Sequence, residues 1–225
     1  MGQQTLVKFL DLANHRQDST PEDIRQLCQA VKKYGFHAAF VNPGYVGLAK
    51  ELLKDSQAVV GTVVSFPLGQ ETKDIKVLSA IKAVDEGADE LDISMNVGLF
   101  KQGSHQEVLA EMEAMVTAVR ELKKSTVVKF IIETGLLKDE EIKKASELVL
   151  KSGADFVKTC SGWGPRGASL KDVELIKQVV GDKIKIKVAG GIDTLKETLD
   201  FINAGAQRIG TSKAVEIIKE YEGHR

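Results

Sequence analysis

The sequence has few of the residues that mark secreted, disulfide-bonded or flexible chains. Its 225 residues include 2 cysteines and 4 prolines, and no apolar run approaches the roughly 20 residues that a membrane helix needs. Two cysteines exclude a disulfide framework and a four-thiolate zinc site, and 4 prolines argue against a long linker. Because Lys8 and Asp11 interrupt the short N-terminal apolar stretch, we expect no secretory signal and a cytoplasmic protein.

An excess of charge of one sign is missing as well. Lys and Arg number 31 and Asp and Glu number 32, so the formal net charge is -1. A balanced chain has no electrostatic basis for binding nucleic acid or an anionic membrane, and we expect neither partner. The histidines share no metal-ligand spacing, which argues against a metal site at His15, His37, His105 and His224.

The chain alternates short, β-branched apolar stretches with longer stretches that have the apolar spacing of a helix. Seven strands are predicted, at residues 36–41, 59–66, 90–95, 126–134, 155–159, 183–189 and 207–210, and residues 8–13 are the candidate for an eighth. Thr20 and Ser169 each precede a helical stretch, and an Asp three residues later can complete a capping box.

Alternating strands and helices imply parallel strands joined by right-handed crossovers. Eight units in 225 residues average about 28 residues each, which is close to the usual size of a βα unit. We therefore predict an α/β fold, a closed (β/α)8 TIM barrel that spans residues 1–225 as one domain. An open doubly wound sheet is the alternative, although no Gly-x-Gly-x-x-Gly dinucleotide motif follows the early strands.

Two lysines end neighbouring predicted strands, where a barrel carries its active site. Lys158 lies among apolar residues, and lost solvation there lowers the pKa of a lysine, so that a neutral amine can form a Schiff base with a carbonyl. A lysine that merely extends to solvent is the other interpretation. Lys187 lies near the end of the next strand, and strands about 4.8 Å apart let the two lysines face each other. One ammonium then lowers the pKa of the other amine.

Carboxylates on other strands are candidate partners for these lysines. Asp92 lies within a strand, and a buried carboxylate needs a cation, so it either relays protons or forms a structural ion pair. Asp11, at the end of the first predicted strand, has the same two interpretations. Lys129 and Glu133 share a face of their strand and form a candidate ion pair with each other.

Glycine-bearing loops follow the last three predicted strands. Gly162 comes after the Lys158 strand, Gly190 and Gly191 come after the Lys187 strand, and Gly210 ends the last strand. Backbone amides at helix N-termini bind phosphate, and barrels bind it after strands 7 and 8, so these loops predict a phosphate site. A tight turn is the alternative role of each glycine. Lys213 begins the final helix, where it either contacts phosphate or lies in solvent.

Seven segments, in order, resemble those of a known family: FVNPGYV at 40–46, VSFPLG at 64–69, GADELD at 87–92, IIETGLL at 131–137, FVKT at 156–159, VAGGI at 188–192 and RIGTS at 208–212. The chain resembles the deoxyribose-phosphate aldolases, which are class I aldolases with a TIM-barrel fold. The resemblance implies reversible cleavage of 2-deoxy-D-ribose 5-phosphate to acetaldehyde and D-glyceraldehyde 3-phosphate. It also implies no metal or organic cofactor, and a homo-oligomer, either dimer or tetramer.

The resemblance assigns a role to each candidate. Lys158 matches the Schiff-base lysine, Lys187 the lysine that tunes it, Asp92 the acid/base aspartate and Asp11 the aspartate near the substrate hydroxyl. The positions that match the phosphate loops are Gly162, Gly190, Gly191, Gly210 and Ser212.

Several pocket positions depart from the family pattern. Ala13, Asn14 and His15 lie where the family often has Thr-Leu-Leu, Phe40 replaces a usual Cys, Ser65 a Gly, Trp163 a Phe or Lys, and Lys213 a Ser. Two alternatives therefore stay open, a related aldolase for another phosphorylated sugar and a sugar-phosphate-binding barrel without lyase activity. Tyr221 matches the tail tyrosine of some members only loosely, and we do not count it as catalytic.

Overall fold

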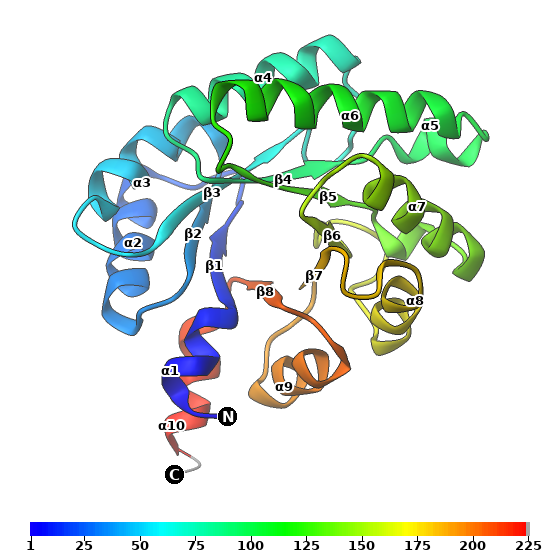
Figure 1. Cartoon of the computed structure of the whole chain (residues 1–225). Coiled ribbons are helices and arrows are strands. Elements are labelled where there is room, and N and C mark those ends of the chain that lie inside the picture. The colour runs from blue at the N-terminus through cyan, green and yellow to red at the C-terminus, as the bar shows by residue number, and fades with distance from the viewer. Residues whose placement is uncertain (224–225) are drawn as a thin grey trace.

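Eight parallel strands close into one barrel in the computed structural model, which describes residues 1–223 (Figure 1). The strands follow chain order, and the last pairs with the first, with Leu10 opposite Ile209. They are β1 (Leu10–Asn14), β2 (Ala38–Val41), β3 (Val59–Val64), β4 (Glu90–Ser94), β5 (Val127–Ile131), β6 (Phe156–Lys158), β7 (Lys185–Ala189) and β8 (Arg208–Thr211). The predicted closed barrel is confirmed, and the open-sheet alternative is wrong.

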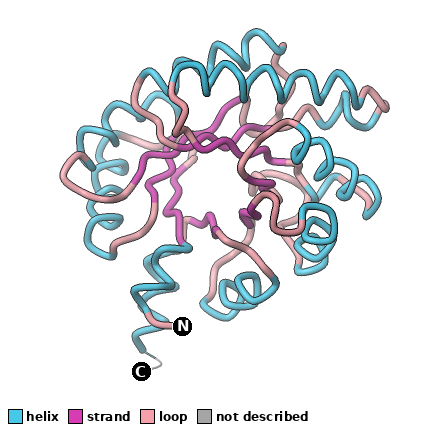
Figure 2. The backbone as a smooth tube through the Cα atoms, in the orientation of Figure 1, coloured by secondary structure: helices cyan, strands magenta, loops and turns pink. Residues whose placement is uncertain are grey.

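Helices surround the barrel on its outside (Figure 2). They are α1 (Gln3–Leu6), α2 (Pro21–Tyr34), α3 (Val46–Leu53), α4 (Lys73–Asp85), α5 (Val97–Lys101), α6 (His105–Leu122), α7 (Asp139–Lys151), α8 (Leu170–Val180), α9 (Leu195–Ala204) and α10 (Ala214–Gly223). Short 3-10 turns are η1 (Val7–Phe9), η2 (Pro43–Tyr45) and η3 (Thr134–Leu136). In the described part of the chain, none of these helices has the length and apolarity to cross a membrane.

Capping residues start two helices where the sequence predicts them. The amide of Asp23 donates to the Thr20 hydroxyl while the amide of Thr20 donates to the Asp23 carboxylate. Ser169 and Asp172 form the same reciprocal pair at the start of α8. Each pair satisfies backbone donors that the first helical turn leaves open.

The strands lie within three residues of their predicted bounds at either end, and two of the differences have a clear structural cause. The first begins at Leu10 instead of residue 8, because residues 7–9 form the turn η1. The fifth ends at Ile131 instead of residue 134. Glu133 has a φ of 53°, a left-handed conformation that a strand cannot contain.

Alternation along the strands separates an apolar layer from a charged one. On β4, Leu91 and Ile93 join the apolar core that packs between strands and helices. Glu90 and Asp92 alternate with them, are buried, and point into the barrel. Inward residues of other strands are charged as well, and together they position the site: Asp11, Lys129, Lys158 and Lys187.

Candidate active site

Strand register brings the predicted catalytic residues to neighbouring positions inside the barrel. Lys158 on β6 lies opposite Lys187 on β7, as strand adjacency predicts. Asp92 on β4 lies opposite Lys129 on β5. Three strands separated by long stretches of sequence therefore present amino groups to one carboxylate.

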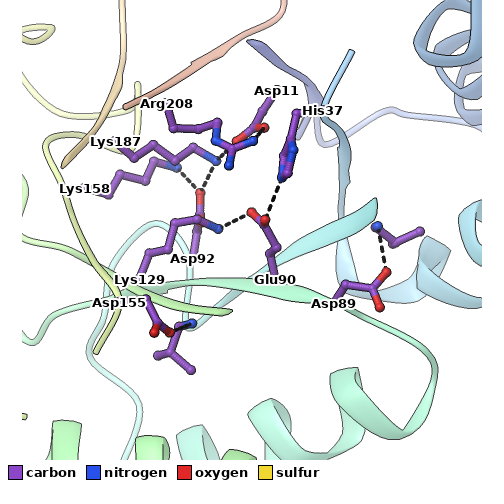
Figure 3. A network of polar contacts seen from close by, with 12 residues as sticks. Asp11, His37, Asp89, Glu90, Asp92, Lys129, Asp155, Lys158, Lys187 and Arg208 are labelled. Atoms are coloured by element: carbon purple, nitrogen blue, oxygen red, sulfur yellow. Dashed lines mark hydrogen bonds and ion pairs between the residues drawn. The ribbon is translucent and has the colours of Figure 1, made fainter. Parts of the chain in front are cut away.

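The carboxylate of Asp92 is the centre of this cluster (Figure 3). Its Oδ2 lies 2.9 Å from the Nζ of Lys158 and 2.8 Å from the Nζ of Lys187, and its Oδ1 lies 3.1 Å from the Nζ of Lys129. Burial by itself raises the pKa of Asp92. The three lysines outweigh burial and hold this pKa well below its ordinary value of 3.8, so the carboxylate is ionised.

Lys158 has fewer carboxylate partners than the other two lysines of this cluster. Lys129 has a second partner in Glu90 at 2.6 Å, and Lys187 has one in Asp11 at 2.7 Å. Within residues 1–223, Lys158 forms an ion pair with Asp92 alone. Burial lowers the pKa of Lys158, and the Lys187 ammonium lowers it further, whereas Asp92 opposes both effects.

The charges of the buried cluster balance when Lys158 is neutral. Three carboxylates then face three cations, namely Asp11, Glu90 and Asp92 against Lys129, Lys187 and Arg208. A protonated Lys158 leaves the cluster with an excess positive charge in a region removed from water, which is costly. The arrangement therefore favours a free amine at Lys158, which is the nucleophile that Schiff-base chemistry needs.

A cavity of about 700 Å³ opens beside this cluster at the carboxyl ends of the strands. Most of the predicted residues line it: Asp92, Lys158, Lys187, Gly162, Gly190, Gly191, Gly210 and Ser212. Two predicted residues do not. Asp11 is fully buried and contacts Lys187, and the half-exposed Lys213 lies 3.4 Å from Glu216 through its Nζ.

The glycine loops pack against each other at the rim of the cavity. Gly190 and Gly191 have φ values of 94° and 75°, which side chains rarely adopt. The amide of Ala168 donates to the carbonyl of Gly190 at 3.2 Å, so the loops after β6 and β7 are joined. The amide of Lys213 donates to the Thr211 hydroxyl at 2.9 Å and is therefore already bonded.

A sequence model of DeoC/LacD family aldolases matches residues 5–214. The chain belongs to this family.

Two relatives of this DeoC/LacD aldolase are described as deoxyribose-phosphate aldolases. The protein of Aciduliprofundum boonei is 46% identical over 222 residues, which cover 99% of each chain. That of Caldicellulosiruptor saccharolyticus is 43% identical over 220 residues, covering 98% of this chain and 100% of the relative.

Solved structures of aldolases agree with the barrel. An aldolase called QR15 superposes with a TM-score of 0.91 at 37% identity, covering 97% of this chain and 96% of its own. A deoxyribose phosphate aldolase from Aeropyrum pernix, described as having a unique tetrameric structure, gives 0.92 at 27% identity and covers 100% and 94%. Together with the family match, these likenesses show that the chain is an aldolase, a carbon–carbon lyase.

The charged interior of this aldolase extends beyond the residues that its sequence points to. The Oε2 of Glu90 lies 2.6 Å from the Nζ of Lys129, and the Oε1 of Glu90 lies 2.8 Å from the Nε2 of His37. Burial by itself lowers the pKa of Lys129, but Asp92 and Glu90 outweigh it and raise the pKa to about 12. Lys129 therefore stays charged. Glu90 and Asp92 are two residues apart and so share one face of their strand, and this spacing is the feature of the sequence that could have revealed the charged interior.

The predicted ion pair between Lys129 and Glu133 is wrong, because β5 ends before Glu133. The left-handed backbone there directs the carboxylate of Glu133 to the next loop, where its Oε2 accepts a hydrogen bond from the amide of Ser161 at 3.1 Å. Glu133 thereby supports a loop that lines the cavity of the aldolase.

His15 and Phe40 line the cavity of the aldolase at positions that differ from the family pattern, and Phe66 lies beside them. The centre of the Phe40 ring lies 3.4 Å from the Nζ of Lys187, and the centre of the Phe66 ring lies 5.8 Å from the Nζ of Lys158. His15 packs against both rings. Burial is the main cause that lowers the pKa of His15 to about 3, so its imidazole is neutral.

The Tyr221 hydroxyl donates to the carbonyl of Met1 at 2.7 Å, so this side chain joins the two ends of the described chain. Residues 1–223 contain no group of three or more His, Cys, Asp or Glu arranged to hold a metal. Of the four histidines considered in the sequence, His224 lies outside the described residues.

Proposed function

We propose that this aldolase reversibly cleaves 2-deoxy-D-ribose 5-phosphate to acetaldehyde and D-glyceraldehyde 3-phosphate through a Schiff base on Lys158. The observation that carries the proposal is the charge balance around Asp92, which favours a neutral Lys158 in a buried cluster of fixed charges. The relatives described as deoxyribose-phosphate aldolases, at 46% and 43% identity, support this substrate.

The proposed steps use the chain's own amino and carboxyl groups. The neutral Nζ of Lys158 attacks C1 of the open-chain sugar and, with loss of water, forms an iminium. Removal of the C3 hydroxyl proton breaks the C2–C3 bond, releases the three-carbon aldehyde and leaves an enamine. Protonation of C2 and addition of water then release acetaldehyde and restore the amine.

Asp92 and Lys187 are the proposed carriers of the protons. The carboxylate of Asp92 contacts the amino groups of both Lys187 and Lys158. A proton therefore has a short path from the reacting atoms at Lys158 to Asp92 and Lys187. Asp11 holds Lys187 in place through their ion pair. Because the iminium withdraws the electrons, the proposal needs no metal or organic cofactor.

The substrate phosphate is proposed to bind at the rim, on the backbone of the glycine loops. Gly162, Gly190, Gly191, Gly210 and Ser212 all line the cavity there. Backbone amides next to the first turns of α9 and α10 suit a dianion. The sequence-based role of Lys213 as a phosphate ligand stays a prediction, since its ammonium lies beside Glu216.

Borohydride reduction in the presence of deoxyribose 5-phosphate tests the nucleophile. The reduced adduct should add the substrate-derived mass to the peptide that contains Lys158, and Lys158→Arg should abolish both labelling and turnover, because a guanidinium stays charged. A label on another lysine would contradict the assignment.

A related aldolase for a different phosphorylated sugar is the second candidate. His15, Phe40 and Trp163 line the cavity and differ from the family pattern, which favours a changed pocket. Comparison of kcat/KM over a panel of phosphorylated sugars distinguishes the two candidates. Binding of these sugars without borohydride labelling and without turnover would favour a barrel that binds sugar phosphates only.

We also propose that residues 1–225 form one functional domain, and that the enzyme is a cytoplasmic homo-oligomer, either dimer or tetramer. Cys28 and Cys160 are free and buried, which suits a reducing compartment. The tetrameric relative from Aeropyrum pernix supports assembly. Light scattering on the purified protein tests it, and a monomeric mass at micromolar concentration would contradict it.

A further inference from the structure

One face of α10 forms part of the cavity wall. Val215, Glu216 and Lys219 line the cavity from this helix, next to the rim residues Gly210 and Ser212. Their spacing places them on one side of the helix. No motif in the sequence singles out Lys219.

Helix geometry directs the Lys219 side chain toward the proposed phosphate site. The helix starts at Ala214, so the Cα of Lys219 lies about 7.5 Å farther along the axis. Side chains on a helix incline toward its N-terminus, and lysine has a flexible four-carbon stem. The ammonium of Lys219 is therefore able to extend back along the cavity wall to the rim.

The other basic side chains that line the cavity already have carboxylate partners. Arg16 pairs with Asp18 at 2.8 Å, and Lys158 and Lys187 both pair with Asp92. In the described part of the chain, no hydrogen bond or ion pair joins the Lys219 ammonium to another residue. Lys219 is thus a lining lysine whose charge no carboxylate of residues 1–223 neutralises.

The rim also carries negative charge, which a bound phosphate must tolerate. The carboxylates of Asp193 and Glu216 line the same cavity. The Lys213 ammonium lies beside Glu216. A dianion on the glycine loops would therefore meet two carboxylates, and an unpaired cation on the same wall offsets this repulsion.

We propose that Lys219 is a specificity-determining residue whose ammonium contacts the phosphate of the substrate. The inference rests on the proposed function, because it assigns a side-chain cation to the phosphate that the glycine loops bind through their backbone. A charge-assisted contact of this kind discriminates phosphorylated from free sugar by about tenfold or more.

The test compares Lys219→Met with Lys196→Met. Lys196 is an exposed lysine on the adjacent helix α9, is paired with Asp200, and lies outside the cavity lining, so it controls for loss of one surface charge. Lys213→Met forms a third arm, and Lys219→Arg restores the charge. For each variant, kcat and KM are measured with deoxyribose 5-phosphate, and kcat/KM with free 2-deoxyribose.

Binding of inorganic phosphate is measured separately through tryptophan fluorescence. Trp163 is the only tryptophan of the chain and lines the cavity, so its emission reports on this site without a label. We expect Lys219→Met to raise KM for the phosphorylated sugar at least tenfold with little change in kcat, and to weaken phosphate binding similarly. Lys219→Arg should recover most of both, and Lys196→Met should behave as wild type.

Several outcomes would overturn the inference. An unchanged ratio of kcat/KM between phosphorylated and free sugar in Lys219→Met would do so, as would equal effects of Lys219→Met and Lys196→Met. An effect confined to Lys213→Met would assign the contact to Lys213. If the wild-type protein does not cleave deoxyribose 5-phosphate, the proposed function fails, and the phosphate titrations alone then decide whether Lys219 binds phosphate.

Discussion

Replacing Lys187 with methionine removes one ammonium beside Lys158 while keeping most of the side-chain volume. Both Nζ atoms contact the same oxygen of Asp92, at 2.8 Å and 2.9 Å. Their separation is therefore at most about 5.7 Å, and at an effective dielectric constant of about 20 the repulsion is about 3 kcal/mol or more. That repulsion favours the neutral form of Lys158, so its loss raises the pKa of Lys158.

Lys187→Met should form the imine with substrate more slowly at neutral pH. At neutral pH a larger fraction of Lys158 carries a proton in Lys187→Met, and about 3 kcal/mol corresponds to a loss of about a hundredfold in the neutral fraction. Asp11 also loses its ammonium partner in this variant, and its negative charge then raises the pKa of Lys158 further. The rate of borohydride trapping with substrate should therefore fall about a hundredfold at pH 7 and recover as the pH rises.

The assay is the pH dependence of trapping, because trapping isolates imine formation from the later proton transfers. Lys185→Met is the matched control, since Lys185 lies on the same strand but is exposed at its other end. An acidic limb at the same pH in wild type and Lys187→Met would refute the role of Lys187 in tuning Lys158. Recovery of trapping without recovery of turnover would assign Lys187 a second role, in proton transfer.

Three further predictions concern cofactors, packing and acid stability. Exhaustive treatment with EDTA should leave activity unchanged, and a loss that zinc restores would contradict the Schiff-base mechanism. Gly61→Ala should lower Tm by several degrees, because its new Cβ collides with the Phe40 ring. The same change in a Phe40→Cys background should cost less, and equal losses would contradict this packing. Burial by itself raises the pKa of Glu90, but Lys129, His37 and Arg208 outweigh it and hold this pKa below its ordinary 4.5. The folded state therefore binds fewer protons than the unfolded state, and the stability that Glu90 contributes is present above about pH 5 and lost as the pH falls. Urea unfolding from pH 5 to pH 3 should therefore show a shallower fall for Glu90→Gln than for wild type, and equal slopes would contradict it.

Short-range signals account for the parts of the fold that the sequence predicts well. Apolar stretches located seven strands, the candidate eighth at residues 8–13 is confirmed as the first strand, and the capping pairs at Thr20 and Ser169 form as expected. The predicted facing of Lys158 and Lys187 is confirmed for the same reason, since it needs only side-chain alternation and the pairing of consecutive strands. The end of β5 was missed, because nothing local announces the left-handed backbone of Glu133.

The aldolase family, the closed barrel and the two facing lysines were thus determined by the sequence alone, because each depends on motifs, on periodicity or on neighbours in strand order. Only the tertiary structure decided the charges that surround Lys158. Arg208 approaches Asp11 because the last strand closes on the first, 197 positions apart in the chain. Glu90 and Lys129 meet across β4 and β5, where the sequence suggested a different partner for Lys129. Buried charges interact through space, so the pKa of Lys158 depends on which charged groups surround it. Closure of the barrel sets these partners, and local sequence does not.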